Sequence, residues 1–176
     1  MNTAQHLTEI RNAVGSRNKR QLKQALDAFE DSQLLEQTIG PEVLEVYKWL
    51  LSDRDATAAP GVDRIFTTFV ADIDKYSASQ IGELVQVIDE HQSTYVQQML
   101  RHTAADFIAR NDDPHHAFDM FKSWARRNEK YACHMALVGI EVLLMSGHAK
   151  QIGVEQEAKS LWNSLVANAL LSPAEN

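Results

Sequence analysis

Side chains that could bind a metal ion lie close together between residues 112 and 116. His115 and His116 follow Asp112 and Asp113 there, separated only by a proline, and imidazole and carboxylate groups are usual ligands of zinc. Neighbouring residues of a helix point about 100° apart, so the two histidines do not converge on one ion. The aspartates have another use, because carboxylates stabilise the first turn of a helix. We therefore predict no metal site.

The sequence also predicts no nucleophilic residue and no cofactor-binding motif. The single cysteine, Cys133, precedes His134 in an apolar stretch, where the two side chains diverge and the thiol is expected to be buried and inert. Asp72 and Asp74 are two residues apart and cannot form a facing acid–base pair. The chain has no glycine-rich loop of the kind that cradles phosphates, so we expect no cofactor and no catalytic residue.

An arginine placed shortly before a histidine is the one enzymatic signal that remains. Arg127 stands seven residues before His134, and Arg110 stands five residues before His115. A guanidinium could hold a phosphate while the imidazole transfers a proton. This spacing resembles the motif of HEPN-type ribonucleases, an all-α family, and the resemblance implies cleavage of RNA. Pro114 breaks the second stretch, unlike the single helix of that family, so a ribonuclease is our alternative and a non-enzyme our main prediction.

Polar residues also line one stripe of an otherwise apolar helix, which we expect over residues 129–146. Lys130, His134 and Glu141 share that stripe. Burying an unpaired charge costs free energy. These side chains therefore either form ion pairs with a neighbouring helix or line a groove that receives a side chain of a partner.

Charge is distributed unevenly along the chain, whose net charge is −7. Residues 1–26 hold five bases and one acid, whereas residues 27–90 hold fourteen acids and four bases. A contiguous acidic third repels nucleic acid and attracts cationic protein surfaces, so we expect a protein partner and no nucleic acid. The simpler alternative is an acidic surface that only aids solubility.

If the acidic third docks a partner, its carboxylates near helix ends are the expected contacts. An exposed Tyr76 or Trp49 would add an aromatic anchor. The predicted partner-binding residues are Asp53, Asp55, Asp63, Asp72, Asp74, Asp89, Glu90 and Tyr76.

Helices must position these residues, because hydrophobic residues recur at helical spacing along almost the whole chain. Residues 93–110 are the clearest case, with apolar side chains at i, i+3 and i+4. Helix starts are marked by Asp113 before Pro114 and by a capping box that begins at Ser77. The helix over residues 129–146 is apolar around nearly its whole circumference and should be buried in the C-terminal half. Short connections favour antiparallel neighbours, so we predict an all-α fold of eight or nine antiparallel helices.

A single domain over residues 1–176 accommodates these helices, because the length suits one core. The N-terminus lacks the basic and apolar regions of a signal peptide, and the chain lacks an apolar run of the roughly 18 residues that a membrane span needs. We therefore expect a cytoplasmic protein that has no membrane partner.

Helix pairs that start near residues 61, 93 and 129 recur at a spacing of about 35 residues. This spacing resembles that of HEAT-type α-solenoid repeats. The junction Asp112–Trp124 and the helix over residues 129–146 are its most repeat-like parts. An irregular helical bundle is the alternative.

In size, acidity and helical layout the chain is similar to the helical immunity proteins of bacterial polymorphic-toxin and contact-dependent growth-inhibition systems. This resemblance implies tight binding of a cognate toxin, commonly a basic nuclease that cleaves RNA or DNA. The toxin's active site or substrate face would be covered. A HEAT-like scaffold for protein–protein interactions is a further alternative.

Overall fold

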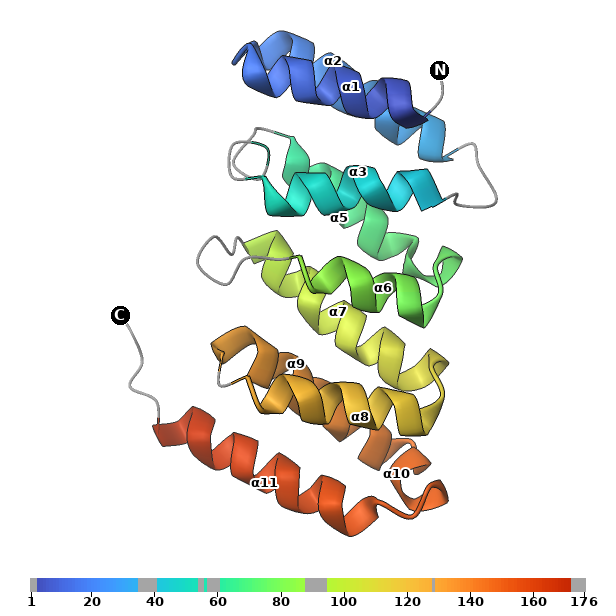
Figure 1. Ribbon diagram of the computed structural model, residues 1–176, viewed down its shortest axis with the longest axis vertical. Helices are drawn as coiled ribbons and strands as arrows, with labels where there is room; N and C mark the ends of the chain where they lie inside the picture. Colours follow the sequence, from blue (N-terminus) through green and yellow to red (C-terminus); the bar gives the residue numbers. More distant parts are fainter. Residues whose placement is uncertain are drawn as a thin grey trace. The chain divides into compact units, whose positions relative to one another are not determined.

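The computed structural model describes residues 3–34, 41–53, 56, 61–87, 95–127 and 129–171. All regular structure in these ranges is helical, without a strand, which confirms the predicted all-α class (Figure 1). The helices are α1 (Thr3–Gly15), α2 (Lys19–Leu34), α3 (Pro41–Ser52), α5 (Val62–Ala71), the 3-10 helix η1 (Ile73–Lys75), α6 (Ala78–Val85), α7 (Tyr95–Asn111), α8 (Pro114–Ala125), α9 (Lys130–Met145), α10 (His148–Gln151) and α11 (Glu155–Leu171). Nine of the described α-helices have eight residues or more. The other, α10, is a single turn, too short for hydrophobic spacing to reveal.

Local sequence sets the helix ends as predicted. The side chain of Ser77 accepts the backbone N–H of Gln80 at 3.2 Å, and the Gln80 side chain accepts the N–H of Ser77 at 2.9 Å, which completes the capping box of α6. Asp113 accepts two N–H groups from the first turn of α8, which begins at Pro114. Gly147 follows α9 in the left-handed conformation, with φ of 79°, a conformation that costs glycine little.

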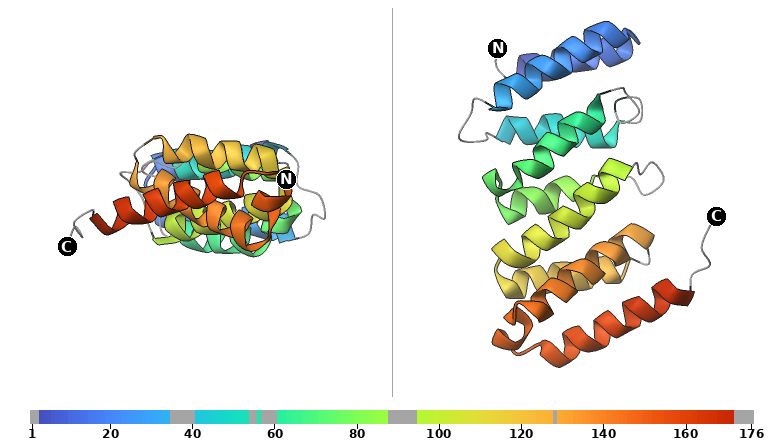
Figure 2. Two further views of the ribbon diagram at one scale, coloured as in Figure 1. Left: turned by 90° about the horizontal axis from the view of Figure 1, so that it is seen from below. Right: turned by 180° about the vertical axis from the view of Figure 1, so that it is seen from behind.

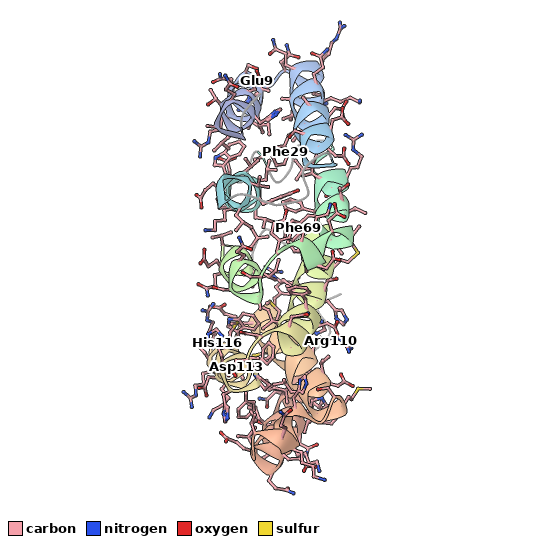
Figure 3. All side chains as sticks on the ribbon, turned by 90° about the vertical axis from the view of Figure 1, so that its right-hand side faces the viewer. Glu9, Phe29, Phe69, Arg110, Asp113 and His116 are labelled. Carbon is pink, nitrogen blue, oxygen red and sulfur yellow. The ribbon has the colours of Figure 1, made fainter. Side chains whose placement is uncertain are left out.

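Two compact units make up the chain, residues 1–100 and residues 101–176, and each is described by itself. In the first unit α1 packs on α2 and α3, α2 packs on α5, and α3 packs on α6. Figure 3 shows α1, α3 and α6 in one row and α2 and α5 in the other. That all helices belong to one domain stays a prediction.

Aromatic rings form the centre of the first unit. Phe29 of α2, Tyr47 of α3, and Phe66 and Phe69 of α5 are all buried. The ring centroid of Tyr47 lies 5.6 Å from that of Phe29 and 4.7 Å from that of Phe69. Such ring pairs add about 0.5–1.5 kcal/mol each beyond the burial of area. The core therefore ties α2, α3 and α5 together and fixes the surfaces that these helices expose.

The central helix of the second unit is α9, as predicted. Helices α8, α10 and α11 all pack against it, and Figure 2 shows α11 running beside α9. At Gly139 the helix comes close to α8, because a Cβ atom at this position would lie 2.2 Å from the nearest ring carbon of Phe121. The two helices therefore have little freedom to shift at this point.

Candidate functional site

The predicted partner-binding aspartates lie at several places in the first unit. Asp63 is exposed in the first turn of α5. Asp72 follows α5 and binds the Lys75 ammonium at 2.8 Å, while Asp74 is exposed in η1. Asp53 follows α3, and its side chain accepts the N–H of Ala56 at 2.9 Å. The other three predicted carboxylates, Asp55, Asp89 and Glu90, lie outside the described residues.

Two of these aspartates lie well apart. Asp63 and Asp72 stand at opposite ends of α5, whose 10 residues span about 15 Å. The two side chains are therefore too far apart to hold the same partner side chain.

The expectation that Tyr76 is an exposed anchor is wrong. Tyr76 is only 5% exposed, and its ring centroid lies 4.6 Å from that of Phe69. Its hydroxyl shares a hydrogen bond with that of Tyr47, and burial raises the pKa of both phenols. The other candidate, Trp49, is half-buried, with the guanidinium of Arg11 5.3 Å above its ring. Tertiary packing thus buries the Tyr76 ring and covers part of the Trp49 ring.

A more coherent acidic site lies where α2 packs on α5. We call it the α2–α5 surface and define it by Asp27, Glu30 and Asp31 of α2 and Asp63 and Arg64 of α5. The Arg64 guanidinium binds Asp27 and also Glu30, the latter at 2.7 Å. These two carboxylates therefore converge on one cation from a single helix.

Further contacts hold this arrangement in place. The Thr68 hydroxyl donates to Glu30 at 2.7 Å, and Lys23 donates to Asp27 at 2.7 Å. The ammonium of Lys23 and the guanidinium of Arg64 lower the pKa of the Asp27 carboxyl, so it stays ionised. Charge-assisted hydrogen bonds of this kind are stronger than neutral ones.

Two carboxylates of the α2–α5 surface remain available for a partner. Asp31 and Asp63 are exposed, and neither forms a salt bridge with a described residue. Of the acidic residues of this surface, only Asp63 was predicted from the sequence, and Asp27, Glu30 and Asp31 were not. Their signal was present in the sequence, because all three lie within one turn of α2, at i, i+3 and i+4.

Another base of the acidic third links two helices through ion pairs. Lys48 binds Glu45 and Glu83, each at 3.1 Å, and so links α3 to α6. Both carboxylates raise the pKa of Lys48, Glu83 more than Glu45. They lie in the row of α1, α3 and α6, so the acidic third presents carboxylates on both rows of the first unit.

Three bases at the start of the chain remain exposed. Arg17, Lys19 and Arg20 lie at the turn between α1 and α2, and no carboxylate of the described residues forms a salt bridge with them. Arg20 and Asp31 are separated by about 16 Å along α2. This exceeds the screening length of about 8 Å at physiological salt, so these bases do not cancel the charge of Asp31.

The arginine–histidine stretches show contacts that the sequence did not reveal. Arg110 is held by Asp106 at 2.9 Å, and α7 ends before His115, so this stretch spans a helix break as expected. Arg127 is exposed in the turn before α9. The ring of His134 lies 5.9 Å from that of His102 on α7.

The polar stripe of α9 is open to solvent. Lys130, His134 and Glu141 are all exposed. Within the described ranges, no salt bridge joins Lys130 or Glu141 to another helix, so ion pairs do not explain the stripe. Cys133 is half-buried rather than buried, with its thiol 3.9 Å from the carbonyl oxygen of Ala125.

No three histidine, cysteine or acidic side chains among the described residues cluster closely enough to hold a metal ion. No described helix combines the length and apolarity that crossing a membrane requires.

The chain matches no family model, no curated protein and no solved structure. Its function must therefore be inferred from its own geometry and charge.

Proposed function

We propose that the α2–α5 surface docks a basic protein, and that the chain is an immunity protein that neutralises a cognate toxin. One observation carries the proposal: four carboxylates of this surface face only two cations, Lys23 and Arg64, and Asp31 and Asp63 are left exposed. A toxin that uses arginine and lysine to grip phosphates presents the complementary charge. Docking there would cover the toxin's active site or substrate face.

The contacts of Arg64 illustrate how such a partner would be held. Asp27 and Glu30, on one side of α2, both form ion pairs with this guanidinium. Asp31 lies on the same turn of α2, Asp63 lies in the first turn of α5, and both are exposed. A partner guanidinium that reached them would form charge-assisted hydrogen bonds. Opposite charge would also speed association, and exclusion of water from the pairs would slow dissociation.

The helical layout supports a rigid docking face. We infer a HEAT-like stacking within the first unit, since α1, α3 and α6 pack successively in one row while α2 packs on α5 in the other. Exposed residues of successive helices in a row then form a continuous surface, as in other helical repeats. We place this action in the cytoplasm.

A charge-reversal experiment tests the proposal. The probe is the protein encoded by the gene adjacent to that of this chain, prepared as a catalytically inactive toxin. Binding is measured by surface plasmon resonance at several salt concentrations. The double variant D31K/D63K should lower the association rate by roughly tenfold or more at low salt, because it removes the attractive field. The neutralising effect in cells should fall in parallel.

The control is D119K/E141K, which makes the same change in net charge on exposed residues of the second unit. It should leave binding nearly intact. Equal loss in both variants would mean that net charge, and not this surface, drives association. An adjacent gene that encodes no toxin would remove the proposal, and weak binding of several unrelated proteins would favour the scaffold alternative.

A further inference from the structure

A histidine pair lies in the second unit, where α7 and α9 come together. The ring centroids of His102 on α7 and His134 on α9 are 5.9 Å apart, and their planes are inclined by 33°. Both residues are exposed. Two imidazoles from different helices can thus reach one small ligand at the surface.

Cationic side chains of the same two helices lie near the ring of Tyr131. The guanidinium carbon of Arg101, next to His102, lies 4.3 Å from the ring centroid of Tyr131. The ammonium of Lys130 lies 6.0 Å from the same centroid. Lys130 is also one helical turn before His134 and shares its face of α9. We call these five residues the histidine-pair face.

The nearest acidic residues along the described parts of α7 and α9 are either paired or further along the helix. Asp106, one turn after His102 on α7, is held by Arg110 at 2.9 Å, and Glu141 is about two turns beyond His134 on α9. Helices α8 and α11, which pack on α9, join Lys122 to Glu157 at 2.7 Å. No carboxylate of the described residues forms a salt bridge with His102, His134 or Lys130.

The sign of the local charge therefore favours an anion over a metal cation. Residues 126–134 contain three bases and one acid, in addition to His134. The second unit is also close to neutral overall, with nine acids and eight bases after residue 100. An anion thus meets local attraction without the repulsion expected from the acidic third.

Protonation links the pair to such a ligand. Partial burial, and to a smaller extent His102, lower the pKa of His134. His134 therefore resists protonation at neutral pH, and a positive charge on one ring of a close pair disfavours a positive charge on the other. A dianion placed between the rings would offset this repulsion and favour uptake of protons.

We propose that the histidine-pair face binds a phosphate-like dianion between His102 and His134, with the Lys130 ammonium as a further donor. In the complex, each ring donates an N–H to an oxygen of the anion. The ligand class is a small molecule that bears a phosphate or sulfate group. This site is independent of the proposed docking surface.

Sulfate is the probe for this proposal, because it remains a dianion between pH 6.0 and 7.5 and any pH dependence then belongs to the protein. Titration at constant ionic strength is followed by the NMR signals of the histidine rings in the full chain. The signals of His102 and His134 should shift with saturation. The dissociation constant should be roughly tenfold or more higher at pH 7.5 than at pH 6.0, since binding is linked to proton uptake.

Alanine substitutions of the two histidines test whether sulfate binds at the histidine-pair face. H102A and H134A should each weaken sulfate binding by roughly tenfold, because each removes a charge-assisted hydrogen bond. The control H115A removes another exposed histidine, on α8, and should bind like the unaltered protein. Should H134A fail to fold, H102A still decides the matter.

Three outcomes would overturn the proposal. The first is sulfate binding that is independent of pH or unchanged in H102A. The second is a response of the two rings to zinc but not to sulfate, which would make the pair a metal site. The third is saturable binding of an RNA oligonucleotide while sulfate has no effect, which would assign the face to nucleic acid.

Discussion

Gly139 offers a quantitative test of the packing that positions the histidine-pair face. The change is Gly139→Ala, which adds a single methyl group in the middle of α9. That group would lie 2.2, 2.4 and 2.5 Å from three ring carbons of Phe121. Phe121 is fully buried and its ring centroid lies 5.5 Å from that of Trp124, so it has no open space to enter.

The expected effect is the balance of two terms. Alanine is favoured over glycine inside a helix by about 1 kcal/mol. Overpacking a tight core costs about 1–3 kcal/mol and occasionally more, and three contacts below 3 Å place Gly139→Ala at the upper end or beyond. We therefore expect the free energy of unfolding to fall by about 2 kcal/mol. For a chain of this length the melting temperature should fall by about 4–8 °C.

Urea unfolding followed by circular dichroism measures this change. The control is Gly15→Ala, at the last position of α1, where a Cβ atom would meet nothing within 4 Å. It should leave stability unchanged or slightly raised. The double variant G139A/F121L should lose less stability than the sum of its single changes, because the smaller side chain relieves the clash. A Gly139→Ala protein as stable as the unaltered one would show that α8 and α9 do not approach as described.

Two further predictions concern pH and helix capping. Burial lowers the pKa of His6 and of His134, so the unfolded chain takes up protons first as the pH falls. The free energy of unfolding should therefore fall as the pH is lowered from about 7 through the ordinary histidine pKa of about 6.5. The fall should end once the pH is below the pKa values of the two histidines in the folded protein. H6Q should flatten this part of a pH series of urea midpoints, and an unchanged slope would contradict the assignment. Ser77→Ala removes the capping box of α6 and should lower the free energy of unfolding by about 1 kcal/mol. The control Ser79→Ala changes an exposed serine of the same turn and should lower it much less. Equal losses in urea unfolding would contradict the capping role.

Features set by neighbours in sequence could be predicted. The cap of α8 needs only Asp113, Pro114 and the turn that follows. The capping box of α6 likewise lies within four residues. The burial of α9 followed from its largely apolar circumference, because a helix with only a narrow polar stripe must be covered on several sides.

Features set by distant contacts could not be predicted. Tyr76 is polar at one end and follows a charged stretch, but Phe69 and Tyr47 bury it. Arg64 finds Asp27 and Glu30 more than thirty residues away. His102 and His134 are equally remote in sequence. Net charge indicated an acidic region but not which helix surfaces would share it, because this depends on how the rows of helices pack.

Hydrogen–deuterium exchange of the complex tests the central claim most directly. The chain is compared alone and bound to the inactive toxin encoded beside it. We predict slower amide exchange in α2 and α5 on binding, centred on Asp31 and Asp63. Protection confined to residues 101–176, with α2 and α5 unchanged, would contradict the proposed docking surface.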